Sequence, residues 1–167
     1  MTKLRAECSS LIGAPAARVY GILADYRDAH QRILPREFFT SIIVEKGGYG
    51  AGTELKVTGR MLGMSRTLRM TAAEPEPGRI LTESDLESGL VTAFIVNPRG
   101  AESCEVTIRT LWTAQPGLAG LMERLVVPGI FRRIYRRELE LLAMVATEVS
   151  GGTSSRVQPP GPKVSKG

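Results

Sequence analysis

The stretch that decides the fold runs from residue 12 to residue 26 and reads IGAPAARVYGILADY. Pro15 suits the first position of a helix, where its missing N–H leaves no hydrogen bond unmade. Four apolar side chains then recur at a spacing that places them on one helical face: Val19, Ile22, Leu23 and Tyr26. We therefore predict a helix over this stretch, with one side packed against the rest of the protein.

Short segments of alternating apolar and polar side chains precede this helix and follow it up to residue 112. In the clearest of them, Leu55 and Val57 face one way while Lys56 faces the other, which is typical of a strand with one buried face. The predicted strands span residues 4–12, 38–46, 53–61, 66–74, 79–85, 90–96 and 103–112. A second short helix is expected at residues 28–32, stopped by Pro35.

A long helix is predicted from residue 117 to about residue 149. It carries two apolar stripes: Leu118, Leu121, Met122 and Leu125, then Ile134, Leu141, Leu142 and Val145. Pro128 lies between the stripes, and we expect a kink or a short break there because proline removes an N–H and clashes with the preceding turn. The sheet is expected to wrap this helix on the side that holds Leu121, Leu125, Ile134 and Leu142.

Length and charge restrict the class of protein. The chain has 167 residues, enough for one domain, which we place at residues 1–149. Residues 150–167 are dominated by Gly, Ser, Pro and Lys and are predicted to be a disordered tail. The net charge is +5, but three of these charges belong to that tail. Aromatic residues are only 5% of the chain, too few for a base-stacking platform, so no nucleic-acid partner is expected.

Cysteine and histidine usage argues against a metal site. Cys8 and Cys104 fall on separate predicted strands, and His30 is the only histidine. A zinc site needs several such ligands at set spacings, so we expect neither a metal nor another cofactor. There is no signal-peptide core and no run of about 18 apolar residues. We expect a cytoplasmic protein with free thiols and no integral membrane segment.

Two ionisable side chains are weak candidates for catalysis. Glu83 lies on an otherwise apolar strand and shares a face with Leu81 and Asp85. A buried Glu83 would have a raised pKa and be a functional candidate, but we favour a position in solvent. His30 could act as a general base near neutral pH, yet its polar neighbours favour a solvated residue on a helix.

Two further clusters are interpreted as structural. The glycines at 47, 48, 50 and 52 are expected to form a hairpin and not a phosphate loop, because a strand and not a helix follows them. The arginines at 132, 133, 136 and 137 favour a solvated helix face with Glu140 as partner. They could also attract an acidic headgroup, so a transient contact with a membrane surface stays open.

Several of these segments together resemble a known superfamily. They are the APAARVY helix start at 14–20, the Gly-rich turn at 47–53, the EPEPGR connector at 74–79 and the long C-terminal helix. They look like the polyketide cyclase/dehydrase and lipid-transport superfamily, the START-like or SRPBCC proteins. The resemblance covers about residues 4–149 and implies an α+β helix-grip fold, in which a curved antiparallel sheet wraps the C-terminal helix, with two short helices after the first strand.

The resemblance also implies a cavity between sheet and helix. The expected ligand-binding residues are the inward side chains Leu55, Val57, Met61, Leu68, Met70, Phe94, Val96, Ile108, Leu125, Phe131 and Tyr135. Tyr135 either hydrogen-bonds a polar group of the ligand or is a core residue with its hydroxyl at the surface, which makes it a third weak catalytic candidate. In that superfamily the turn that corresponds to residues 47–53 borders the cavity mouth, so the resemblance implies the same position here.

The leading hypothesis for function is a soluble carrier that encloses an apolar small molecule, such as a lipid, polyketide, isoprenoid or quinone-like compound. The alternative is a cyclase, aromatase or dehydratase acting on a similar compound, which requires an acid–base pair on the inner wall. A weaker third hypothesis is a protein-interaction module that uses the outer face of the sheet. The ligand and the oligomeric state stay open.

Overall fold

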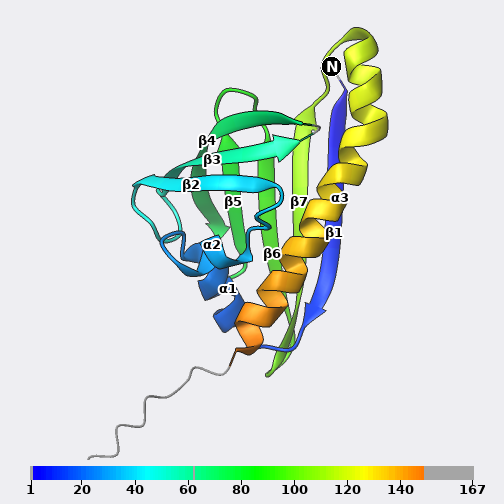
Figure 1. Ribbon diagram of the computed structural model, residues 1–167. Helices are drawn as coiled ribbons and strands as arrows, with labels where there is room; N and C mark the ends of the chain where they lie inside the picture. The colour runs from blue at the N-terminus through cyan, green and yellow to red at the C-terminus, as the bar shows by residue number, and fades with distance from the viewer. Residues whose placement is uncertain (1, 62, 149–167) are drawn as a thin grey trace, which may run out of the picture.

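The computed structural model describes residues 2–61 and 63–148. Within these residues, seven strands form one antiparallel sheet in the order β1-β7-β6-β5-β4-β3-β2, and three helices lie on its concave side (Figure 1). In chain order the elements are β1 Lys3–Ile12, α1 Ala16–Ala24, α2 Ala29–Ile33, β2 Phe39–Lys46, β3 Glu54–Met61, β4 Met64–Glu76, β5 Ile80–Asp85, β6 Val91–Gly100, β7 Ser103–Thr113 and α3 Gly117–Thr147. The predicted α+β helix-grip fold is confirmed.

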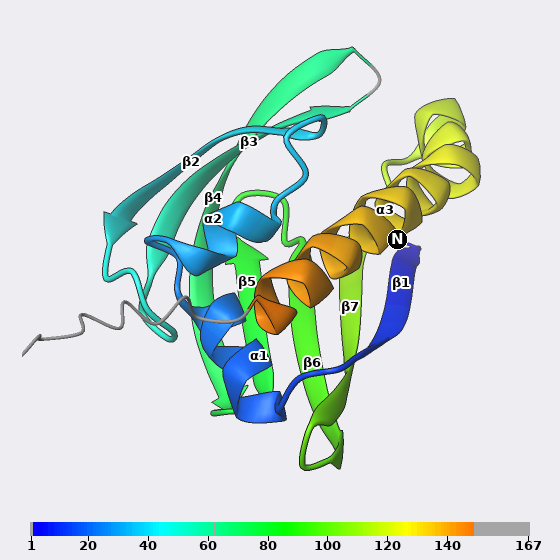
Figure 2. The ribbon, with the colours of Figure 1, turned by 60° about the horizontal axis from the view of Figure 1, so that its bottom comes forward.

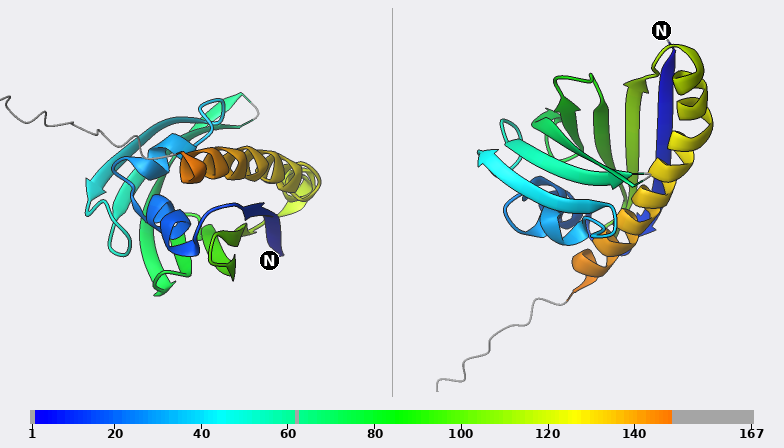
Figure 3. Two further views of the ribbon diagram at one scale, coloured as in Figure 1. Left: turned by 90° about the horizontal axis from the view of Figure 1, so that it is seen from below. Right: turned by 45° about the horizontal axis from the view of Figure 1, so that its top comes forward.

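The sheet curls around α3, as Figure 3 shows from two directions. β1 is the strand at one edge of the sheet. It pairs with β7, so that Leu4 lies opposite Trp112 and Ile12 opposite Cys104. At the other edge, β2 and β3 form a hairpin that bends over the helices. The predicted tail at residues 150–167 and the last residue of the predicted helix lie outside the described residues.

The first helix is shorter than the predicted stretch. Ile12 still belongs to β1, and Pro15 is the N-cap and not the first helical residue; its carbonyl accepts the hydrogen bond of the Val19 N–H at 3.1 Å. At the other end, Asp25 leaves the helix and forms a β-bridge with Tyr49. The apolar face is as predicted, since Val19, Leu23 and Tyr26 are fully buried.

The glycine turn between β2 and β3 is a hairpin, as predicted. All four glycines of the turn have a positive φ, a backbone conformation that other residues adopt at a cost in free energy: Gly47, Gly48, Gly50 and Gly52. The turn packs on α1, because the Gly50 N–H donates to the carbonyl of Ala24 at 2.9 Å. It therefore lies against a helix end and not at the cavity described below, which corrects the expectation that it borders the cavity mouth.

The last helix corrects two expectations. The helix bends in Figures 1 and 2, but it runs unbroken through Pro128. The angle between its two apolar stripes is therefore that of one continuous helix. At about 100° per residue, Leu118 and Ile134 point about 160° apart around the helix axis. Both stripes cannot face the sheet, and the second one does: Ile134, Leu142 and Val145 are buried and Leu141 is half-buried.

The first stripe faces solvent instead. Its side chains are highly exposed: Leu118 82%, Leu121 50%, Met122 59% and Leu125 71%. In these first turns of α3, Glu123 is on the side of the helix that faces inward. Its carboxylate accepts hydrogen bonds from the Trp112 indole at 2.8 Å and from the Gln115 N–H at 2.9 Å. The expectation that Leu121 and Leu125 pack under the sheet is wrong.

Candidate ligand cavity

A cavity of about 1120 Å3 lies between the inner face of the sheet and the helices α2 and α3. Most of its lining is apolar, and the side chains come from β2 to β7 as well as from both helices. Leu55, Val57, Met70 and Phe94, on β3, β4 and β6, form what we call the apolar wall. Opposite them, Val127, Phe131 and Ile134 of α3 close the space.

Most of the predicted ligand-binding residues line this cavity. They are Leu55, Val57, Met61, Leu68, Met70, Phe94, Phe131 and Tyr135. Val96 and Ile108 face inward as expected, but they belong to the buried core and do not line the cavity. Leu125 does neither, because it lies on the solvent side of α3.

A row of polar side chains crosses the inner face of the sheet beside the apolar wall. Glu83 on β5 lies opposite Thr92 on β6, and Thr92 lies opposite Thr110 on β7. The two threonine hydroxyls are 2.7 Å apart, and the hydroxyl of Tyr135 on α3 hydrogen-bonds Thr110. We call Glu83, Thr92, Thr110 and Tyr135 the polar row. Cross-strand register places its three strand members, since Glu83, Thr92 and Thr110 lie opposite one another on β5, β6 and β7. The fourth member, Tyr135, comes from α3.

His30 is buried against this row, which corrects the expectation of a solvated residue. It is only 2% exposed, and its ring stacks on Tyr26 at 4.6 Å between centroids. Its Nδ1 lies 2.6 Å from the carbonyl of Leu23, so Nδ1 donates a proton to it. Its Nε2 lies 3.6 Å from Oε1 of Glu83. His30 and Glu83 therefore face each other at the wall of the cavity.

Glu83 and Asp85 are also buried, which corrects the preference for solvent. The face they share with Leu81 is the inner one, as the alternating burial of β5 shows. Burial alone would raise the pKa of Asp85, but hydrogen bonds from the Ser88 side chain and N–H hold that pKa below its ordinary value. Asp85 therefore caps the β5–β6 turn, whereas Glu83 lines the cavity.

Glu138 on α3 completes the group, and the sequence analysis did not single it out. Its side chain lines the cavity and is only 3% exposed. Burial, together with the nearby charge of Glu83, raises the pKa of Glu138 well above its ordinary value, so the neutral acid is favoured. A signal was present: Glu138 is four residues from both Ile134 and Leu142, on the stripe that packs inward.

Three of these side chains have unused hydrogen-bonding capacity. Within the described residues, Oε1 of Glu83, Oε1 of Glu138 and the hydroxyl of Tyr26 have no hydrogen-bond partner. Burial raises the pKa of Tyr26 and of Tyr135, so both stay protonated donors. Because buried polar atoms are nearly always paired, these atoms indicate room for a polar group of a bound molecule or for water.

Two other observations bear on the class of site. Among residues 2–61 and 63–148, no three histidine, cysteine or acidic side chains gather as metal ligands would. In the same residues, no helix is both long and apolar enough to span a membrane.

Residues 3–147 match a family model described as "Polyketide cyclase / dehydrase and lipid transport". Among solved structures, the KanY protein has 30% sequence identity and a TM-score of 0.74, with 86% of this chain and 97% of that chain covered. No curated protein matches the chain.

Two more distant structures share the fold. The Zhui aromatase/cyclase from Streptomyces sp. R1128 has 15% identity and a TM-score of 0.72, covering 87% of this chain and 94% of that one. Norcoclaurine synthase from Thalictrum flavum, in complex with dopamine and hydroxybenzaldehyde, has 16% identity and a TM-score of 0.66, covering 86% of each. At such identities the likeness shows the fold alone.

Proposed function

Because this chain belongs to the polyketide cyclase/dehydrase and lipid-transport family, we propose that it binds an apolar small molecule that carries at least one hydrogen-bonding group. The observation that supports the proposal is that one cavity holds both an apolar surface and carboxylate oxygens without a hydrogen-bond partner. An apolar wall built around Val57 and Phe94 faces the same space as the unpartnered carboxylate oxygens of Glu83 and Glu138. A purely apolar ligand would leave both oxygens without a partner.

The size of the cavity supports a lipid, polyketide, isoprenoid or quinone-like compound. Its volume of about 1120 Å3 is at the upper end of ligand sites, which usually hold several hundred Å3. Burying about 200 Å2 of apolar ligand surface contributes about 5 kcal/mol, at about 25 cal/mol per Å2. The polar row then discriminates among ligands, because a hydroxyl or amino group that meets Glu83 regains the hydrogen bonds it loses on leaving water.

We propose a cytoplasmic location for this carrier, and its two cysteines are consistent with that location. Cys8 on β1 and Cys104 on β7 are free thiols, as is usual in a reducing compartment.

The test is denaturing mass spectrometry of small molecules that co-purify with the recombinant protein. We expect a compound with a large apolar skeleton and one or more hydroxyl, carbonyl or amino groups. The Val57→Trp variant should lose it, because the indole projects from the apolar wall and narrows the cavity. Lys56→Trp is the matched control, since it adds the same side chain one residue away on the outer face of β3. Equal recovery from both variants would place the compound on the surface and contradict the proposal.

A second candidate function is acid–base catalysis on the same class of compound, and the grouping of Glu138, Glu83 and His30 favours it. In a dehydration, the Glu83–His30 pair would accept a proton from a carbon of the substrate. Neutral Glu138 would donate a proton to the leaving hydroxyl, which departs as water, so that one proton enters the protein and one leaves it. A pair of this kind is what the cyclase or dehydratase hypothesis requires.

Carrier and catalyst differ in what happens to the ligand. Once the co-purified compound is known, it is incubated with wild type and with Glu138→Gln, Glu83→Gln, His30→Ala and Tyr135→Phe. Acid–base groups contribute about 10²–10⁴-fold to rate, so an enzyme should convert the compound and lose most of that rate in the first three variants. A carrier should return the compound unchanged, with affinities altered by about tenfold or less for each lost hydrogen bond.

A further inference from the structure

The outward face of α3 is amphipathic along its length. Its first turns expose the stripe of Leu118, Leu121, Met122 and Leu125, which we call the apolar stripe. Further along the same outward face, Arg132, Arg133 and Arg136 are exposed, since Arg136 follows Leu118 by five whole helical turns. A helix with adjoining apolar and arginine-rich surfaces is typical of segments that lie in the plane of a membrane interface.

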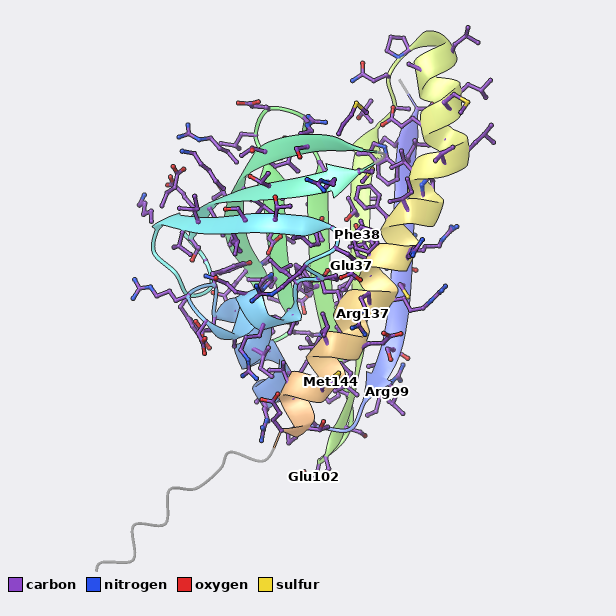
Figure 4. The ribbon with its side chains drawn as sticks, viewed as in Figure 1. Glu37, Phe38, Arg99, Glu102, Arg137 and Met144 are labelled. Carbon is purple, nitrogen blue, oxygen red and sulfur yellow. The ribbon has the colours of Figure 1, made fainter. Side chains whose placement is uncertain are left out.

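The charges on this face are available to a partner. Within the described residues, Arg132 and Arg136 form no ion pair with an acidic side chain. Arg133 and Arg124 form none either, but Arg133 packs its guanidinium over the ring of Phe38 and Arg124 donates to the hydroxyl of Thr2. Arg137, by contrast, points to the side and pairs with Glu140 at 3.0 Å and with Glu37 at 3.9 Å (Figure 4). The unpaired arginines make the outward face of α3 complementary to an anionic surface.

The apolar stripe adjoins the mouth of the cavity. The mouth is defined by residues that line the cavity and are also exposed to solvent: Arg60, Met64, Ser65 and Arg66 on β3 and β4, Glu87 and Ser88 after β5, and Thr113, Gln115 and Pro116 before α3. Leu118 follows Pro116 by two residues, and Met64, itself 69% exposed, adds an apolar side chain on the other rim. A flat apolar surface placed here would meet the stripe and the opening together.

We propose that the apolar stripe and the arginines of α3 dock on an anionic lipid surface, with the cavity mouth turned toward the bilayer. An apolar ligand then passes between membrane and cavity without crossing water. A second copy of the chain is a poorer occupant, because it would present the same unpaired arginines to this face and not the anionic groups that complement them. Docking goes beyond the proposed function, and vesicle binding is measured without any ligand.

The experiment is flotation of the full chain with vesicles of phosphatidylcholine alone or mixed with phosphatidylglycerol. We expect binding to the mixed vesicles that weakens as salt is raised. Leu118→Glu/Leu125→Glu should lower the partition coefficient by more than about tenfold, because two apolar anchors are lost to charged groups. Leu11→Glu/Ile43→Glu is the matched control, since it makes the same chemical and charge change at exposed sites on β1 and β2.

A second pair of variants isolates the arginines. Arg132→Gln/Arg136→Gln should weaken binding to the mixed vesicles by about fivefold for each charge and leave binding to phosphatidylcholine alone unchanged. Equal losses in the α3 variant and the β1/β2 control would mean that net charge, and not this face, governs binding. Absence of vesicle binding by wild type, or self-association that Leu118→Glu/Leu125→Glu abolishes in its place, would overturn the proposal.

Discussion

The apolar wall and the polar row meet on β6, the one strand that contributes to both. On β6, Phe94 and Thr92 both face inward, yet Phe94 belongs to the wall and Thr92 to the row. Phe94 packs its ring edge on His30 at 5.6 Å between centroids, whereas Thr92 hydrogen-bonds Thr110 at 2.7 Å. Two positions on one strand thus differ in chemistry. In the proposed function, the wall would supply ligand affinity and the row would supply selectivity.

The largest expected difference between wall and row is in stability. Phe94→Ala should lower the free energy of unfolding by about 3–5 kcal/mol, because it removes a buried aromatic ring and enlarges an existing cavity. Thr92→Val keeps the volume and should cost only about 0.5–1.5 kcal/mol for its hydrogen bond. Urea denaturation measures both. Equal losses would mean that the row carries as much of the fold as the wall does.

The carboxyl group of Glu138 should produce an effect of intermediate size with a defined pH dependence. Because the pKa of Glu138 is raised in the folded state, its ionisation favours the unfolded state as pH climbs above the ordinary value of 4.5. Glu138→Gln should therefore be more stable than wild type at pH 7, because glutamine has no carboxyl group that ionises on unfolding. Below pH 4.5 the two proteins should melt together. A gain that does not change with pH would contradict the raised pKa.

The smallest effect is expected at the end of the polar row. Tyr135→Phe removes the hydrogen bond to Thr110 and nothing else, so unfolding should become easier by about 1 kcal/mol. The control is Tyr49→Phe, because Tyr49 is exposed and its change should stay within about 0.5 kcal/mol of zero. Thermal melts compare the two. If Tyr49→Phe lowered the stability as much as Tyr135→Phe, the hydrogen bond of Tyr135 would not stabilise the fold.

The fold was predictable because local patterns determine it. Alternation along residues 53–61 and the glycines of the preceding hairpin predict a strand and its turn without any tertiary information. The alternation of β5 also showed that Glu83 shares a face with Leu81; what it could not show was which face is buried. That depends on whether a helix covers the strand, and α2 brings His30 there from a distant part of the sequence.

The candidate site was harder to predict because cross-strand register assembles it. Thr92 and Thr110 are ordinary strand residues until pairing sets them beside Glu83 and beneath Tyr135. Glu138 had a sequence signal, its place on the stripe of Ile134 and Leu142, but a neighbouring run of arginines suggested a surface partner. The exposed Leu118 and Leu125 were misplaced for a related reason, since an expected break at Pro128 concealed that the two stripes of α3 are out of phase.

The most direct test of a cavity with an apolar wall and a polar row is a matched pair of ligands. Naphthalene and 1-naphthol differ by one hydroxyl, and their affinities are measured by calorimetry for wild type and for Glu83→Leu/Glu138→Leu. Wild type should prefer 1-naphthol by about tenfold, the value of a hydrogen bond to a carboxylate, and the double variant should lose that preference while it binds naphthalene at least as well. An unchanged preference in the variant, or no binding of either compound to wild type, would contradict the account.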